Sequence, residues 1–158
     1  MFRKMRREKQ AVSPETCRHI LQTEGRGVLS LIGDEGWPYG VPMNFYYEPA
    51  ENTLYFHTAK AGHKLDAIRK CSKACFTVIH PDGKDAGDWA WRVTSIIAMG
   101  HAECIDDPVR TEKMVRRLAL KYYPSADDVE AEIRAAIQHV QLVALPIQHM
   151  TGKQIHEK

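Results

Sequence analysis

The chain has 158 residues, of which 44% are hydrophobic and 27% charged, and its formal net charge is +2. This length and composition predict one globular domain over residues 1–158 with a sizeable core. The near balance of 22 basic and 20 acidic residues gives no reason to expect nucleic-acid binding. No apolar run approaches the roughly 20 residues that a bilayer-spanning helix needs, so no membrane segment is expected.

The chain begins with a basic segment, "MFRKMRREKQ", which predicts a basic N-terminal arm over residues 1–12. The segment lacks the apolar middle of a signal peptide, so a cytoplasmic protein is expected. Its basic residues fit a solvated arm or a contact with an anionic partner. The following "SPETCRHIL" predicts a helix, with Ser13 as N-cap, Pro14 at the first helical position and Gly25 as its stop.

The next part of the chain reads as strands separated by tight turns. "GVLSLI", "WPYGVPMNFYYE" and "TLYFHTA" are joined by the turns "GDEG" and "PAEN". Such short connections predict antiparallel hairpins, because parallel strands need a longer crossover. Pro38 and Pro42 lack a backbone N–H, so their strand is expected at a sheet edge or at a bulge.

The remainder adds strands and short helices. Asp107 is the candidate N-cap of one helix, which Pro124 is expected to end, and Ser125 or Asp127 is the candidate N-cap of the next. The predicted elements, in chain order, are the helix "GHKLDAIRK", the strands "KACFTVIH" and "VTSIIAMGHAECI", the two helices, and a closing strand "HVQLVALPIQHM" that "TGK" ends. The whole predicts a mainly β protein with peripheral helices, a small antiparallel barrel of about six strands.

Neither metal nor nucleophile motifs stand out. The four cysteines, Cys17, Cys71, Cys75 and Cys104, show no C-x-x-C spacing and are interpreted as free, buried or half-buried residues. His57 and His63 lack a Cys pair or an H-E-x-x-H helix beside them, so no metal site is predicted. No G-x-S-x-G elbow occurs.

The stretch "YFHTAKAGHKLDAI" is the main site candidate. A helix that starts after Gly62 offers free backbone N–H groups to an anion, Thr58 adds a hydroxyl, and Lys60 and Lys64 add charge. The alternative is a polar loop with solvated lysines, and spacing alone does not separate the two. In the same way, "VPMNF" fits either a strand against which an aromatic heterocycle lies or an edge strand interrupted by proline.

Together these segments resemble the flavin-binding split barrels related to pyridoxamine 5′-phosphate oxidase, and most closely the branch of nitroimidazole-resistance proteins. The resemblance runs through "MRREKQ", "GVLSLIGDEGWPYGVPMNF", "LYFHTAKAGHKLDAI", "CFTV", "SIIAMGHA", "LALKYYP" and "HMTGK". It implies a six-stranded antiparallel split barrel and a homodimer with FMN bound at the dimer interface.

The resemblance also implies which residues meet the cofactor. Val41, Pro42, Met43 and Asn44 are expected along the isoalloxazine ring, chiefly through backbone. The expected contacts to the rest of FMN come from Phe56, His57, Thr58, Ala59, His63, Lys64, Arg7 and Ser95. Relatives often carry Tyr-Arg before that serine, whereas this chain has Val93 and Thr94.

The implied activity is that of an FMN-dependent oxidoreductase, because a flavin supplies its own redox chemistry. The substrate class is a small electron-poor molecule such as a nitro compound, with NAD(P)H as the electron donor to test and His57 as the substrate-side candidate. Authentic pyridoxamine 5′-phosphate oxidase activity is not expected, because no arginine-rich segment accompanies "TGKQIHEK". The alternative is a non-catalytic module that holds flavin, deazaflavin or haem, with His57 or His63 as haem ligand.

Overall fold

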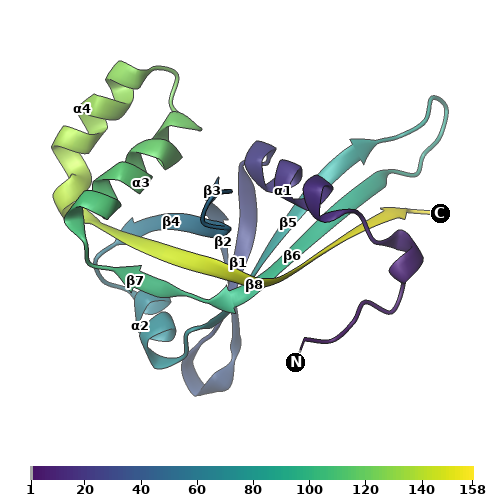
Figure 1. Ribbon diagram of the computed structural model, residues 1–158, viewed down its shortest axis with the longest axis horizontal. Coiled ribbons are helices and arrows are strands. Elements are labelled where there is room, and N and C mark those ends of the chain that lie inside the picture. The colour runs from purple at the N-terminus through teal and green to yellow at the C-terminus, as the bar shows by residue number, and fades with distance from the viewer. Residues whose placement is uncertain (1) are drawn as a thin grey trace.

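The computed structural model describes residues 2–158 as a strongly curved antiparallel sheet with helices at its sides (Figure 1). Met1, part of the predicted basic arm, lies outside the described residues. The strands are β1 (Arg26–Ile32), β2 (Pro38–Asn44), β3 (Tyr46–Glu48), β4 (Thr53–Ala59), β5 (Lys73–Gly83), β6 (Arg92–His101), β7 (Glu103–Ile105) and β8 (Val140–His156). The helices are α1 (Pro14–Thr23), α2 (His63–Lys70), α3 (Pro108–Leu120) and α4 (Ala126–Ala136), with short 3-10 turns at Glu8–Gln10, Asp34–Gly36 and Ile137–His139.

Every strand pairing is antiparallel, in the order β2-β1-β5-β6-β8-β4-β3, with β7 also paired to β8. Strand β8 joins the two halves of the sheet, since its first part pairs with β4 and its second part with β6. The split-barrel prediction is confirmed by this arrangement.

The six long strands match the predicted number, and β3 and β7 are two additional three-residue strands. Phe45 separates β2 from β3, because its backbone N–H donates to the Tyr122 hydroxyl at 2.9 Å instead of to a strand. Strand β2 is the end strand, as the prolines Pro38 and Pro42 predicted.

The predicted helix starts are also confirmed. Ser13 and Ser125 each accept a hydrogen bond from the backbone three residues on, and Asp107 accepts from the N–H groups of Val109 and Arg110. Helix α3 ends at Leu120, four residues before the proline that was expected to end it.

The expectation that "TGK" ends the last strand is wrong. Strand β8 continues to His156, with Thr151 opposite Ile97 and Lys153 opposite Ser95. Gly152 lies where α1 crosses the strand, and a Cβ there would collide with Cys17 Sγ and Val12. The glycine therefore permits close helix–strand packing and does not form a turn.

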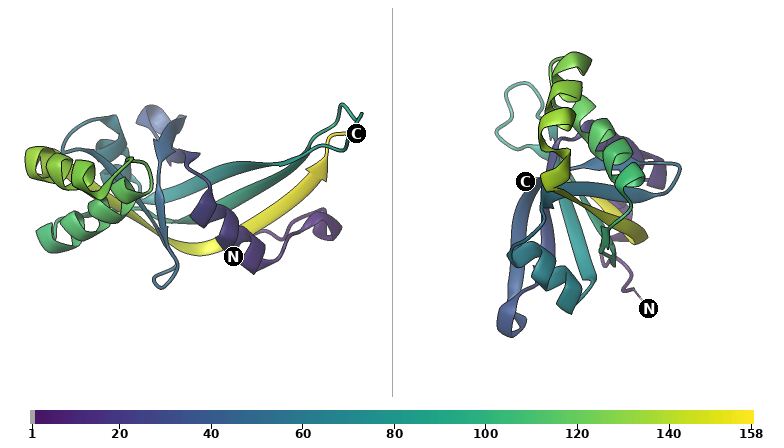
Figure 2. Two further views of the ribbon diagram at one scale, coloured as in Figure 1. Left: turned by 90° about the horizontal axis from the view of Figure 1, so that it is seen from above. Right: turned by 90° about the vertical axis from the view of Figure 1, so that its left-hand side faces the viewer.

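Two apolar clusters organise the interior. The larger one contains Leu21 of α1 together with Phe45, Phe56 and Phe76, and Phe76 meets Phe45 edge-on and Phe56 at a tilt. Helices α3 and α4 pack on the other side of β4 and β8, around Tyr55. Figure 2 shows these helices together at one end of the molecule and the long β5–β6 hairpin at the other.

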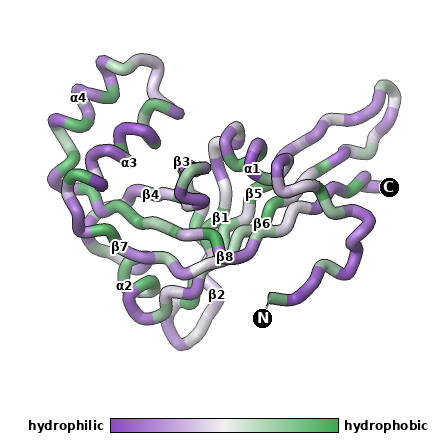
Figure 3. Tube along the Cα trace, viewed as in Figure 1, coloured by the Kyte–Doolittle hydropathy of each residue, from purple (hydrophilic) through white to green (hydrophobic). Residues whose placement is uncertain are grey.

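The hydropathy of the helices reflects their packing on the sheet. Hydrophobic and hydrophilic residues alternate along α3 and α4 (Figure 3), as expected for helices with one buried face. All four cysteines are free; Cys17 is buried and the other three are half-buried, as predicted. Within residues 2–158, none of the helices has the length and apolar character to cross a membrane.

Candidate functional site

Two cavities meet at the ends of β2 and β4. The first, which we call the Lys64 cavity, has a volume of about 470 Å³. The second, which we call the helical cavity, has a volume of about 300 Å³ and lies mostly between α3 and α4. The Lys64 cavity is lined by Pro42, Met43, Asn44, His57, Thr58, Ala59, Lys64, Ala136, His139 and Val140.

Strand β4 presents its two faces to different surroundings. Phe56 is fully buried in the larger apolar cluster, so only its backbone is available at the strand surface. His57 shares the opposite face with Tyr55, which packs against α3 and α4. Thr58 and Ala59 lie at the end of the strand, where the chain turns toward α2. The end of β4 therefore brings both His57 and Thr58 to the Lys64 cavity, and His57 also to the helical cavity.

Helix α2 begins beside this strand end. Its N-cap is Gly62 at φ 129°, a conformation that side chains rarely adopt. The first hydrogen bonds of α2 run from the N–H groups of Leu65 and Asp66 to the Gly62 carbonyl. The amides of His63 and Lys64 precede these bonds and belong to the unpaired donors of a helix start. Of these residues Lys64 lines the Lys64 cavity, so its ammonium lies there near the positive end of the helix.

The His63 side chain points elsewhere. Its ring stacks on Tyr39 with centroids 4.1 Å apart, and its Nε2 lies 3.5 Å from Asp34 Oδ2. The ring therefore packs against the β1–β2 hairpin. Only the backbone N–H of His63, at the start of α2, is left for the predicted anion contact. Val41 lies opposite Leu29 in the sheet and does not line either cavity.

Strand β2 supplies the other wall. As the end strand, it leaves alternate backbone N–H and C=O groups without a strand partner on its outer side. Pro42 has no N–H to offer there, which leaves its outer edge open to a planar group. Asn44 closes the strand, and its side-chain amide forms no hydrogen bond within residues 2–158.

His57 is the residue common to both cavities that can titrate near neutral pH. Burial among the cavity walls lowers the pKa of its imidazole below the ordinary 6.5, and the charge of Lys64 lowers it further. The ring keeps contact with solvent, so the removal of water around it is partial. A lowered pKa leaves the imidazole neutral at pH 7, able to donate or accept a hydrogen bond.

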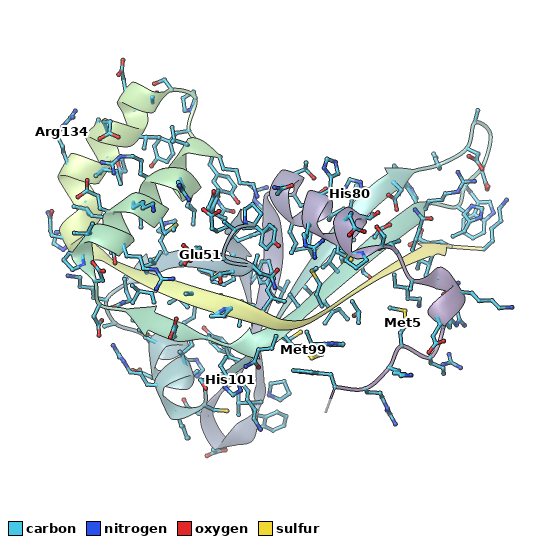
Figure 4. All side chains as sticks on the ribbon, in the orientation of Figure 1. Met5, Glu51, His80, Met99, His101 and Arg134 are labelled. Atoms are coloured by element: carbon cyan, nitrogen blue, oxygen red, sulfur yellow. The ribbon has the colours of Figure 1, made fainter. Side chains whose placement is uncertain are left out.

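Ser95 and Arg7 lie far from the Lys64 cavity of their own chain. Ser95 pairs with Lys153 and His57 with Leu142, so the two positions are eleven steps apart along β8, about 36 Å of strand. Arg7 is exposed and belongs to the N-terminal segment, whose Ala11 also bridges to Lys153. Figure 4 shows Met5 of this segment and Arg134 of α4 at opposite ends of the molecule.

Val93 and Thr94, which stand where relatives often carry Tyr-Arg, pair with the C-terminal part of β8, also far from the Lys64 cavity. Thr94 is buried and its hydroxyl donates to Asp82 at 2.6 Å. The nearby Arg92 forms a two-bond ion pair with Asp85, at 2.9 and 2.7 Å. Arg92 is thus engaged within its own hairpin in the described structure.

Sequence reasoning missed Ala136, His139 and Val140, which complete the Lys64 cavity. A usable signal existed for Val140, because an antiparallel pairing of the last strand with β4 brings it opposite Ala59. Residues 2–158 contain no group of three or more His, Cys, Asp and Glu side chains placed to hold a metal ion.

The arrangement suits a phosphorylated planar cofactor. Lys64 and the first amides of α2 match a phosphate, and the free edge of β2 matches a heterocycle with donors and acceptors along its rim.

A sequence model of the family described as pyridoxamine 5′-phosphate oxidase matches residues 13–154. No curated protein matches the chain.

Several solved structures share the fold. A candidate 5-nitroimidazole antibiotic resistance protein from Bacteroides thetaiotaomicron is 23% identical, with a TM-score of 0.77 over 92% of this chain and 87% of that one. The flavocytochrome Anf3 from Azotobacter vinelandii is 22% identical, with a TM-score of 0.76 over 95% and 71% of the two chains. A FAD- and haem-binding protein from Mycobacterium smegmatis is 20% identical, with a TM-score of 0.74 over 94% and 74%. At these identities the likeness concerns the fold.

Proposed function

Because the chain belongs to the pyridoxamine 5′-phosphate oxidase family, we propose that it binds FMN in the Lys64 cavity and acts as an FMN-dependent oxidoreductase. The observation that carries the proposal is the convergence of the free edge of β2, the end of β4 and the start of α2 on one cavity. Similar structures include flavin-binding proteins, which supports a flavin-associated role.

Different residues of the Lys64 cavity would bind different parts of FMN. Lys64 and the amides at the start of α2 would hold the phosphate, with Thr58 as a further donor. The backbone from Pro42 to Asn44 would lie along the ring system. When bound, the flavin supplies electron transfer, and the protein supplies position and electrostatics.

We propose further that the site is completed in a homodimer. On β5 and β6, Ile79 lies opposite Ser95, and Val28 and Ile97 share this face of the sheet. Leu29, on the alternate face, is buried, whereas Val28 is 39% and Ile79 64% exposed. An exposed apolar sheet face of this kind suits a second copy. We propose that docking there brings Ser95 and Arg7 to the partner's cavity, although Ser95 lies about 36 Å along β8 from its own.

The proposed substrate is a small electron-poor molecule, with a nitro compound as the first to test. The likeness to a candidate 5-nitroimidazole resistance protein supports this choice. NAD(P)H is the proposed electron donor. His57, a neutral imidazole between the two cavities, is the proposed substrate-side residue, placed to donate a hydrogen bond to an oxygen of the substrate.

A second candidate function is flavin or haem binding without turnover. It is favoured by the similar structures of a flavocytochrome and of a FAD- and haem-binding protein. Either His57 or His63 would then be the candidate haem ligand, and His63 would have to leave its stack with Tyr39.

One series of measurements tests these proposals. The purified protein should show a flavin absorption spectrum, and the released cofactor should have the mass of FMN and not of FAD. Under anaerobic conditions NAD(P)H should bleach the flavin, and a nitroimidazole should restore its colour. A Soret band would favour haem binding. Failure to retain or take up any flavin would refute the proposed function, and a flavin that neither nucleotide reduces would favour the binding module.

A further inference from the structure

The helical cavity is distinct from the Lys64 cavity but adjoins it. The two share four residues, Asn44, His57, Ala136 and Val140. Beyond this shared edge, the helical cavity extends between α3 and α4, where the proposed flavin contacts do not reach. Its volume of about 300 Å³ lies at the lower end of the range for small-molecule sites.

The walls of the helical cavity are apolar and come from both helices. They include Val115, Leu118 and Ala119 of α3 and Val129 and Ile133 of α4. These five side chains are also among the most buried of their helices. A ligand between them would replace water with apolar contacts over most of its surface.

One wall of this cavity is fixed to the sheet by polar contacts. Arg110 of α3 donates to Glu51 at 3.0 Å and to the Tyr55 hydroxyl at 2.6 Å, and Arg117 pairs with Glu48. These contacts tie both ends of α3 to the β3–β4 hairpin. The wall that α3 forms is therefore fixed to the sheet by residues outside the cavity lining.

The polar side chains that line the cavity are Asn44 and His57 at the shared edge and, away from it, Tyr122, Tyr123 and Glu132. Asn44 and His57 form no side-chain hydrogen bond within residues 2–158, and the lowered pKa of His57 leaves its imidazole uncharged. Glu132 of α4 also lines the cavity and is exposed. A ligand would meet two neutral side chains at the shared edge, where His57 keeps contact with solvent, and the negative charge of Glu132 elsewhere on the wall, an arrangement that disfavours anions.

We propose that the helical cavity binds a neutral aromatic molecule of one or two rings, whose hydrogen-bond-accepting oxygen faces Asn44 and His57. An apolar cavity of about 150 Å³ holds benzene, so about twice that volume admits a substituted ring. The proposal rests on the proposed function in one respect: with FMN in the Lys64 cavity, the oxygen-bearing end of this ligand lies at the edge that the two cavities share.

The test uses acetophenone, a neutral aromatic ketone, and benzoate, an anion of similar size. Acetophenone is added to isotopically labelled protein with and without FMN, and methyl NMR spectra are recorded. Its ring protons should give nuclear Overhauser effects to the methyl groups of Val115, Val129 and Ile133. Benzoate should bind at least about tenfold more weakly, because its charge must lose water in the cavity.

A matched pair of variants supports the assignment. Ala119→Leu fills part of the cavity and should weaken acetophenone binding at least about tenfold. Ala135→Leu makes the same change on the exposed side of α4 and should alter binding by less than about twofold. If Ala119→Leu does not fold, the Overhauser contacts in the unaltered protein decide the question alone.

The outcomes separate this inference from the proposed function. If acetophenone contacts only other methyl groups, or if benzoate binds equally well, the proposed site in the helical cavity is wrong. FMN binding is measured separately by flavin fluorescence, and its result does not depend on this one. Acetophenone contacts in a protein that takes up no flavin would support the site and refute the proposed function.

Discussion

The two cavities that meet at His57 are built in opposite ways. The Lys64 cavity uses strand ends, backbone groups and one lysine, and four of its ten lining residues lie within the stretch from His57 to Lys64. The helical cavity uses apolar side chains of α3 and α4, far from that stretch in sequence. A short segment can thus reveal an anion site by its own composition, whereas an apolar cavity emerges only when separate elements pack together. The predictions below separate the two cavities.

The largest expected effect concerns the charge at the Lys64 cavity. Lys64→Met should weaken FMN binding about 10- to 100-fold, because a charge-assisted contact to the phosphate contributes roughly 1.5–3 kcal/mol. Flavin fluorescence titration measures the affinity. Acetophenone binding should stay unchanged, since Lys64 does not line the helical cavity.

Lys70→Met is the control for this variant. Lys70 is exposed at the opposite end of α2, so its removal tests for a general charge effect. Equal FMN affinity in Lys64→Met and the unaltered protein would place the phosphate elsewhere. Equal losses in the two variants would indicate long-range attraction in place of a direct contact.

Local chemistry explains how much of the site the sequence could predict. Thr58, Gly62 and Lys64 lie within seven residues, and the strand-to-helix joint brings them together whatever the rest of the fold. Pro42 predicts a strand at the edge of the sheet because it lacks an N–H, and β2 is the end strand. Properties of this kind depend on the backbone nearby.

Long-range packing explains the rest. The direction of His63 depends on its stack with Tyr39, which no local pattern specifies. The continuation of β8 through Gly152 depends on the crossing of α1, so a glycine that resembles a turn is instead a close-packing position. Ser95 and Arg7 came from the family resemblance, and their separation from His57 becomes apparent only with the register of β8.

A moderate effect is expected where the helical cavity joins the sheet. The Tyr122 hydroxyl accepts from the Phe45 N–H at 2.9 Å and lies within reach of the carbonyl oxygens of Phe45 and Gly25. Tyr122→Phe leaves the Phe45 N–H and the Gly25 carbonyl without this partner, while the Phe45 carbonyl keeps Lys121 Nζ at 3.3 Å, and should lower the free energy of unfolding by about 1–3 kcal/mol. Denaturant unfolding measures the loss.

Tyr123→Phe is the matched control, because that ring is 41% exposed and its hydroxyl forms no hydrogen bond within residues 2–158. It should change stability by less than about 0.5 kcal/mol. Tyr122→Phe should also weaken acetophenone binding more than FMN binding, since Tyr122 lines only the helical cavity. An equal loss of affinity for acetophenone and FMN would mean that the substitution changes both cavities at once.

The smallest expected effect is a change in the titration of His57, the residue that both cavities share. Burial lowers the pKa of its imidazole below 6.5 and Lys64 lowers it further, so NMR titration should find a midpoint below that value. Because the unfolded state then takes up the proton first, the folded state should lose stability as the pH falls below 6.5. His57→Gln should remove this part of the pH dependence, and an unchanged pH profile of stability in that variant would contradict it.

The two ligands should move the pKa of His57 in opposite directions. The phosphate of FMN would offset the charge of Lys64, which is the second cause of the lowered value, so FMN should raise the pKa. Acetophenone carries no charge and would displace water from the ring, so it should lower the pKa further. Lys64→Met should raise the pKa in the free protein but not above 6.5, because burial remains its first cause. Shifts of the same sign with both ligands would mean that they occupy the same cavity, and the distinction between the two would fail.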